Sequence, residues 1–175
     1  IKVEAYDKNF PLIIDPWITY YGGIDDEFGK GIKTDSQGNV LVTGMTYSNN
    51  FPTSTGAFQT VKGATSDVYI VKFNSMGVRQ WATLFGGNNA ELGWCIATDN
   101  NDNAVVTGYT VSSNFPTTVT AFQPALNVGV SSDVFVLKLN SAGNRVWATY
   151  YGGEHYDGAD GICTCLLYTS PSPRD

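Results

Sequence analysis

Short runs of β-branched and aromatic residues alternate along the chain with clusters of glycine, asparagine, serine and aspartate. No stretch shows the apolar spacing of an amphipathic helix, whereas short apolar runs bounded by turn-forming residues are typical of β-strands. The pattern therefore predicts an all-β chain. The predicted strands cover 29–34, 40–46, 68–73 and 78–85, and then 93–98, 104–110, 134–139 and 144–151.

The strand pattern repeats because the sequence itself repeats. WITYYGG at Trp17 returns as WATLFGG at Trp81 and as WATYYGG at Trp147, which sets periods of 64 and 66 residues. The second unit follows the first along its whole length, with one insertion near 125–129, and the third unit continues to Thr164. The resulting division is a non-repeat segment at 1–16, repeat units at 17–80 and 81–146, and a truncated third unit at 147–164.

The third strand of each unit decides between sheet architectures. Positions 68–71 and 134–137 are apolar throughout, which indicates strands that are buried on both faces. Four-stranded antiparallel sheets that cover one another at a fixed period describe the blades of a β-propeller. A β-helix has a much shorter period, and tandem immunoglobulin-like sandwiches need about 100 residues each. We therefore predict a partial β-propeller, with two four-stranded antiparallel blades and the start of a third.

Composition and charge narrow the classes of partner. Charged residues make up 15% of the chain, the net charge is −6 and the pI is about 4.6. Nucleic-acid binding and attraction to anionic membrane surfaces both depend on lysine and arginine, so neither is expected. No apolar run is long enough for a membrane-spanning helix. The surplus of glycine, threonine, serine and asparagine is instead typical of secreted β-proteins.

The last eleven residues, CLLYTSPSPRD at 165–175, depart from the repeat. The pattern predicts Asp where Cys165 stands, and the string resembles a translated sequencing-library adaptor. We therefore expect 165–175 to be a non-native tail, with a natural tail as the alternative. Of the other cysteines, Cys95 and Cys163 lie in different repeats with no metal-binding spacing, and we expect both to be small buried apolar residues.

The repeated motifs identify a family resemblance. They run W-x-T-x-x-G-G, T-D-x-x-x-N-x-x-V-T-G-x-T, N-F-P-T-x-x-x-A-F-Q and S-D-V-x-x-x-K-x-N-S-x-G-x-x-x-W. From Trp17 to Thr164 the chain resembles the SBBP family of bacterial β-propeller repeats, and 1–16 resembles the end of the β-rich domain that often precedes them. The resemblance implies a large secreted or surface-attached bacterial protein. It implies no defined reaction and transfers no catalytic residues.

The long loop of each unit carries the repeated segments FPTSTGAFQ at 51–59 and FPTTVTAFQ at 115–123. A loop of this length needs anchors, and we expect Phe51 and Phe58 to be those anchors, with Gln59 bonded to loop carbonyls. The alternative is an aromatic platform for a ligand. Trp17, Trp81 and Trp147 are likewise expected to be wedges between blades, with exposed sugar-stacking surfaces as the alternative.

Several polar segments are candidates for binding chemistry. The segments 35–39 (DSQGN) and 99–103 (DNNDN) supply oxygen donors. The first has only one carboxylate and the second lacks the closing glutamate of a calcium loop, so ordinary turns are favoured over a metal site. Asp25-Asp26-Glu27 and Glu154-His155-Tyr156-Asp157 follow Gly-Gly and should lie on one rim. His155 is the only histidine, and an exposed loop residue is favoured over an acid–base catalyst.

These observations lead to one function and two alternatives. We expect a non-enzymatic propeller module of a bacterial secreted or cell-surface protein, a scaffold that contacts protein or glycan through its rim loops and packs against further blades of the same parent chain. No catalytic, cofactor-binding or metal-ligating residue is assigned, and the ligand-binding residues are unknown. The alternatives are a carbohydrate-active propeller enzyme whose site is completed by missing blades, and a spacer without a ligand.

Overall fold

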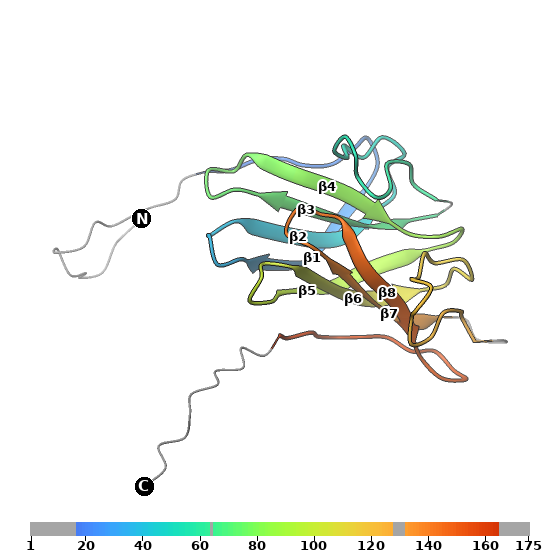
Figure 1. Cartoon of the computed structure of the whole chain (residues 1–175). Helices are drawn as coiled ribbons and strands as arrows, with labels where there is room; N and C mark the ends of the chain where they lie inside the picture. The colour runs from blue at the N-terminus through green and yellow to red at the C-terminus, as the bar shows by residue number, and fades with distance from the viewer. Residues whose placement is uncertain (1–16, 64, 128–131, 165–175) are drawn as a thin grey trace, which may run out of the picture.

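A computed structural model describes residues 17–63, 65–127 and 132–164, within which the secondary structure is entirely β (Figure 1). Eight strands form two four-stranded antiparallel sheets, ordered β1-β2-β3-β4 and β5-β6-β7-β8. The strands of the first sheet are β1 (Glu27–Thr34), β2 (Val40–Thr46), β3 (Asp67–Phe73) and β4 (Arg79–Phe85). Those of the second sheet are β5 (Glu91–Thr98), β6 (Ala104–Thr110), β7 (Asp133–Leu139) and β8 (Arg145–Tyr151).

The eight predicted strands are all present, and their ends differ from the prediction by no more than two residues. The sheets and the sequence units are out of phase. Trp81 opens the second sequence unit but lies in β4, the outer strand of the first sheet. Each unit therefore contributes to two neighbouring sheets. The predictions for 1–16 and 165–175 lie outside the described residues.

Local turn chemistry fixes the register of the hairpins. Between β1 and β2, the Asp35 carboxylate accepts hydrogen bonds from the backbone N–H groups of Gln37 and Asn39 at 2.9 Å each. Gly38 follows with φ of +75°, a conformation that favours glycine. The prediction of an ordinary turn at 35–39 is confirmed, and 99–103 folds alike around Asp99.

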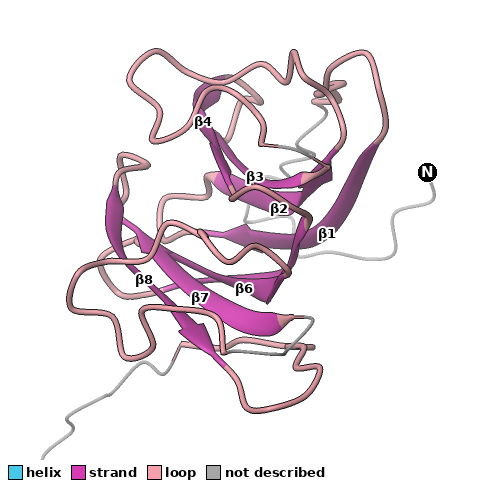
Figure 2. Cartoon of the chain, turned by 90° about the vertical axis from the view of Figure 1, so that its right-hand side faces the viewer, coloured by secondary structure: helices cyan, strands magenta, loops and turns pink. Residues whose placement is uncertain are grey.

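The second sheet packs face to face on the first, because β5 contacts β1, β2 and β3 (Figure 2). Every residue of β3 is buried, as its apolar sequence predicted. Burial alternates along β7 instead, because no further sheet covers its other face within the described chain. The described part of the chain is thus a partial propeller of two blades and is not closed into a ring.

Aromatic rings join the two sheets into one core. Phe115, from the long loop of the second sheet, lies between Phe85 of β4 and Phe135 of β7, with ring centroids 5.1 and 4.9 Å away. Phe85 and Phe135 are fully buried. Each such ring stabilises the fold by about 1.5–3 kcal/mol through burial alone, so the contact between blades is an integral part of the core.

The third unit continues as an irregular segment at 153–164, which contacts β5 through Asp160 and Thr164. A chain of threonines connects the three units: the Thr98 hydroxyl donates to the Thr34 carbonyl at 3.2 Å, and Thr164 donates to the Thr98 carbonyl at 2.5 Å. Cys95 is only half-buried and Cys163 is exposed, so the prediction of two buried cysteines is wrong. Cys95 lies on β5 beside the irregular segment that ends at Thr164, and Cys163 lies within that segment, which no other described element covers completely.

Candidate functional site

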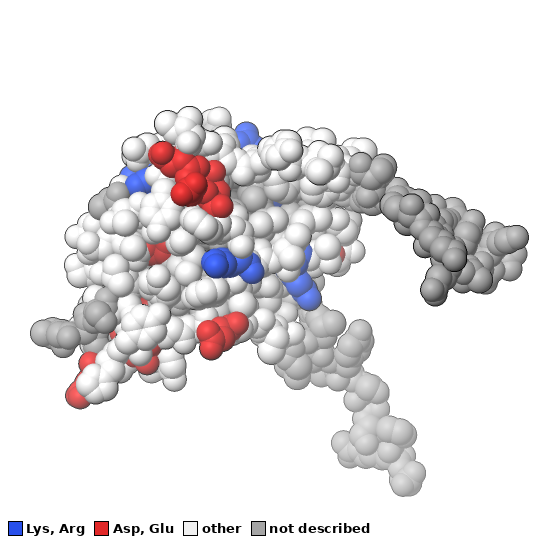
Figure 3. All heavy atoms as spheres, turned by 180° about the vertical axis from the view of Figure 1, so that it is seen from behind, with Lys and Arg blue, Asp and Glu red and all other residues white. Residues whose placement is uncertain are grey.

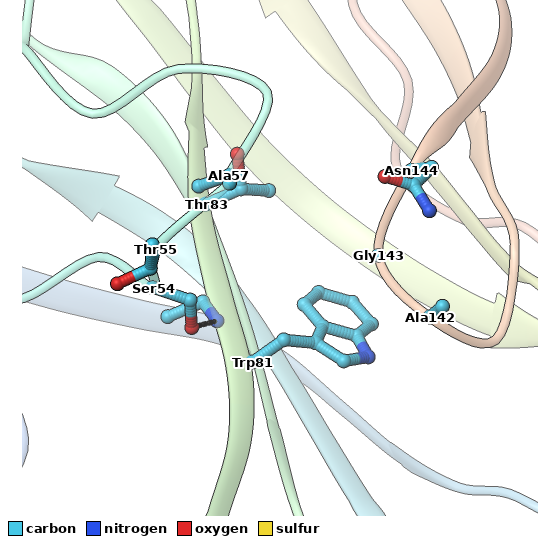
Figure 4. Close-up of a pocket in the computed structure, with 10 residues that line it drawn as sticks. Ser54, Thr55, Ala57, Trp81, Thr83, Ala142, Gly143 and Asn144 are labelled. Carbon is cyan, nitrogen blue, oxygen red and sulfur yellow. Dashed lines mark hydrogen bonds between the residues drawn. The ribbon is translucent and has the colours of Figure 1, made fainter.

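Trp81 connects the two blades at their outer edge (Figure 4). Its indole N–H donates to the Ser141 carbonyl in the β7–β8 turn at 3.0 Å, and only 9% of the residue is exposed. A Cβ atom added to Gly143 in that turn would lie 2.7 Å from the indole ring, so the ring fills the space that glycine leaves. The prediction of a blade-packing wedge is confirmed for Trp81.

The other two tryptophans show what this wedge requires. Trp17 covers Gly77 in the same way, with its ring 2.7 Å from the position of an added Cβ, and it also contacts Phe73. Trp147 is 37% exposed, because no turn of a further blade covers it within the described chain. The same residue type is therefore a buried wedge where a following turn is present and a half-open surface where none is.

The two phenylalanines of each long loop behave differently. The first is a buried anchor, as predicted for Phe51, which is 4% exposed, and as seen also for Phe115 at 3%. The second is not: Phe58 is 38% exposed and Phe122 is 81% exposed. The prediction that Phe58 anchors its loop is wrong in this respect. Its ring stacks on Phe85 at 4.7 Å, at the boundary between the blades rather than inside the loop.

Gln59 organises the end of the first loop. Its side-chain amide donates to the Val61 carbonyl at 2.9 Å and to the Asp67 carboxylate at 2.5 Å, and its side-chain oxygen accepts from the Gly86 N–H. The predicted bond to a loop carbonyl is confirmed. The bond to Asp67 was not predicted, because an aspartate beside a turn is ordinarily a surface residue, and only its recurrence as Asp133 marks it as structural.

Two buried carboxylates face each other across Gly86. Asp67 begins β3 and Glu91 begins β5, and both are 0% exposed. A Cβ atom on Gly86 would lie 2.5 Å from an Asp67 oxygen and 2.6 Å from a Glu91 oxygen, so only glycine fits between them. Glu91 accepts hydrogen bonds from the Gly87 N–H at 3.0 Å and from the Thr110 hydroxyl at 2.6 Å.

Burial controls the protonation of this pair. It raises the pKa of Glu91 to about 7, against partial compensation by hydrogen bonds from Ser112, Thr110 and Gly87. Burial also raises the pKa of Asp67, although the Gly63 N–H and the Lys62 charge favour its ionised form. Raised carboxyl pKa values occur at acid–base catalytic sites. Here both groups lie inside the blade interface without access for a substrate, which favours a structural role.

In each sheet, an aspartate in the turn between the first two strands forms an ion pair with a lysine of the third strand. Asp35 pairs with Lys72 at 2.8 Å, with side chains 0% and 7% exposed, and Asp99 pairs with Lys138 at 2.7 Å in a more open setting. Burial raises the pKa of Asp35, but the bonds from Lys72 and Asn39 outweigh it, so the net pKa lies below the ordinary value. The oxygen-rich turns are therefore held by lysine. Within 17–63, 65–127 and 132–164, no group of three or more acidic, histidine or cysteine side chains is arranged to hold a metal ion.

The predicted rim segments are partly as expected. Asp25 and Asp26 are exposed, and His155 is an exposed loop residue. Glu27 instead begins β1, is half-buried, and accepts bonds from the Gly23 N–H at 3.1 Å and the Thr46 hydroxyl at 2.8 Å. It occupies the place of Glu91 in the other blade. The side-chain oxygen of Asn50 caps this connection by accepting from the Ile24 N–H.

The surface carries few charges. On the face in Figure 3, one acidic cluster and a few scattered basic and acidic groups are separated by uncharged surface, and no broad basic patch is visible. No helix capable of crossing a membrane occurs in the described part of the chain.

Comparisons with known proteins agree with this architecture. Residues 17–52 match the SBBP family, a beta-propeller repeat. The chain is also similar to an uncharacterized WD repeat-containing protein of Acanthamoeba polyphaga mimivirus, at 30% identity over 132 residues. That alignment covers 67% of this chain and 9% of the viral protein, so the chain spans about a tenth of its relative.

Proposed function

Because the chain carries an SBBP β-propeller repeat, we propose that it is a non-enzymatic repeat module of a bacterial secreted or cell-surface protein. The stacked units act as a scaffold, and their rim loops contact protein or glycan. One observation supports this most: the residues through which the first sheet contacts the second, Phe58 and Phe85, recur as Phe122 and Tyr151 at equivalent positions of the second sheet. The polar, weakly charged composition is compatible with an extracellular location.

The outer face of the second sheet is the candidate surface for a further blade. A groove of about 520 Å³ is lined by Phe122 and Tyr151, which occupy the places of Phe58 and Phe85 in the first sheet. In the first sheet, Phe115 of the next blade covers Phe85. We infer that a further blade of the same parent chain covers Tyr151 in the same way.

The connections that follow each Gly-Gly pair are the candidate contact surface. In the first connection Ile24 is 81% exposed and is followed by exposed Asp25 and Asp26. In the corresponding third connection Glu154 and His155 are exposed. The backbone of the first connection is held by hydrogen bonds from Ile24 and Asp25 to side chains of the neighbouring loop. A fixed backbone with varied side chains suits recognition at low entropic cost.

Lengthening the chain tests the scaffold proposal. Residues 165–175 are replaced by a copy of 99–164, which supplies one more unit in phase with the repeat. We expect the exposed indole of Trp147 to become buried, so its fluorescence shifts to shorter wavelength and acrylamide quenches it less. A Trp147→Phe version of the same chain identifies its signal. Unchanged quenching of Trp147 would contradict the proposal.

The rival function is a carbohydrate-active enzyme with a site completed by further blades. The lengthened chain should therefore also be incubated with aryl glycosides and oligosaccharides. The scaffold proposal predicts no product. Release of shorter saccharides would favour the enzyme and would direct attention to paired carboxylates in the added blades.

A further inference from the structure

Three successive units meet side by side along one edge of the described chain, which we call the inner edge: β1, β5 and the segment 157–164. The strands β1 and β5 are in contact. The Cys95 thiol on β5 donates to the Asp160 carbonyl at 3.1 Å, which places the third unit next to the second. The threonine chain described above fixes the same order at the end of each strand.

Each of the two inner strands contains a β-bulge at the same place. In β1, Gly29 pairs with Gly44 and Gly31 pairs with Thr43, so Lys30 has no partner residue on β2. In β5, the same shift between Gly93 and Cys95 leaves Trp94 as the extra residue. A bulge re-aims the side chain of its extra residue, and bulges are frequent next to binding and active sites.

The third unit places Asp160 at the corresponding position. Asp160 follows Trp94 by the same 66 residues that separate Trp147 from Trp81. The contacts agree: a Cβ atom on Gly31 would lie 3.1 Å from the Trp94 carbonyl, and the Cys95 sulfur lies 3.1 Å from the Asp160 carbonyl. The segment 157–164 therefore lies against β5 at positions equivalent to those at which β5 lies against β1.

The residue type at the bulge position differs between the three units, although two nearby residues are the same in all three. The three units share isoleucine two residues later and threonine four residues later, but at the bulge they carry an ammonium group, an indole and a carboxylate. Packing alone gives no reason for such a change inside a repeated frame. Lys30 and Asp160 are exposed, Trp94 is half-buried, and the Lys30 ammonium lies 4.7 Å from the centre of the Trp94 ring.

We propose that Lys30, Trp94 and Asp160 form a binding row for an uncharged carbohydrate. The indole offers an apolar face for sugar C–H groups, the ammonium donates to ring or hydroxyl oxygens, and the carboxylate accepts from hydroxyl groups. The two charges cancel, so the row favours a neutral ligand over a polyanion, which Asp160 would repel, and over a polycation, which Lys30 would repel. This deepens the proposed scaffold role by naming a ligand class for a surface other than the rim loops.

The test is a titration of the full chain with three uncharged hexasaccharides, namely cellohexaose, xylohexaose and hexa-N-acetylchitohexaose, and binding is followed by tryptophan fluorescence and calorimetry. We expect saturable binding of at least one, a loss of about tenfold in affinity for Trp94→Ala, and smaller losses for Lys30→Met and Asp160→Asn. Trp94→Phe keeps a ring and should retain most of the affinity. Trp147→Ala, which removes a half-exposed indole on β8, should leave the affinity unchanged.

Three results would overturn the proposal: no saturable binding of any of the three sugars up to about 10 mM, equal binding by folded Trp94→Ala protein, or tighter binding of an anionic oligogalacturonate or a cationic chitosan hexamer. Chromatography of the same mixtures separates the two proposals. Shorter saccharides released from a bound sugar would refute the non-enzymatic role and retain the site, whereas absence of binding refutes the site and leaves the rim-loop scaffold standing.

Discussion

Gly143 offers the sharpest test of the contact between blades. It has φ of +85°, and an added Cβ would lie 2.7 Å from the Trp81 ring. Gly143→Ala therefore introduces two separate penalties. An alanine in the left-handed region costs about 1–2 kcal/mol, and overpacking against a buried ring costs about 1–3 kcal/mol more. We expect the free energy of unfolding to fall by about 2–5 kcal/mol in total.

Gly38 provides the matched control, because it has φ of +75° and no heavy atom within 4 Å of an added Cβ. Gly38→Ala should therefore show only the backbone penalty of about 1–2 kcal/mol. Both variants are measured by urea denaturation with far-UV circular dichroism, which does not depend on the tryptophan signal. In a Trp81→Ala background, Gly143→Ala should fall to the same small cost, since the ring it collides with is gone.

Equal destabilisation by Gly143→Ala and Gly38→Ala, within about 0.5 kcal/mol, would refute the reasoning. It would mean that the β7–β8 turn does not lie against Trp81. An additive double mutant would lead to the same conclusion by an independent route. A change in the urea m-value would instead indicate that the variant alters the unfolded state or the number of unfolding steps.

Three further predictions concern buried groups. Lys72→Met should lower the free energy of unfolding by about 3–5 kcal/mol, because it leaves the buried Asp35 carboxylate unpaired. Lys138→Met, at the more open pair, should lower it by about 1 kcal/mol, and equal midpoints in urea would contradict this. The pKa of Glu91 is about 7 in the folded state, against an ordinary value of 4.5. The contribution of Glu91 to stability is therefore complete below about pH 4.5 and declines by roughly 3 kcal/mol as the pH rises through 7. Glu91→Gln should flatten that decline in thermal unfolding measured from pH 5 to 8, and an unchanged slope would exclude Glu91 as its source. Trp81→Ala should lower the free energy of unfolding by about 3–5 kcal/mol and Trp147→Ala by about 1 kcal/mol, because Trp81 is 9% exposed and Trp147 is 37% exposed. The reverse order in chemical denaturation would refute the role of Trp81 as a wedge between the blades.

The strands could be predicted from sequence because their signals are local. Alternation of apolar runs with Asp- and Gly-containing turns located β2 and β6 without error, and the fully apolar run in β3 indicated burial on both faces. The same signals do not show which four consecutive strands form one sheet, because the boundary of a sequence repeat can be placed at any position within it. Only the pairing of β3 with β4 shows which Trp belongs to which sheet.

The chemistry at the blade interface was harder to predict because it depends on contacts between distant residues. Glu91 follows Gly-Gly, where a sequence normally places an exposed turn, yet it is fully buried. The period itself held the missing signal: Glu27, Glu91 and Asp157 recur at one position, as do Asp67 and Asp133. An acid that recurs with a structural repeat is better explained by packing. Conversely, the repeat gives no signal for Trp94, because the equivalent residues Lys30 and Asp160 share no chemistry with it.

The central claim, that successive units stack as blades in the described register, can be tested by one crosslink. The Ser36 hydroxyl in the β1–β2 turn donates to the Asp102 carboxylate in the β5–β6 turn at 2.8 Å. Cysteines at these two positions, with the three native cysteines replaced by serine, should form a disulfide under mild oxidation. The pair Ser36→Cys with Ser141→Cys, which places the second thiol at the opposite edge of the second sheet, should not. Ready crosslinking of 36 with 102 alone is the predicted result, whereas free thiols at both positions, or equal crosslinking of both pairs, would contradict the account.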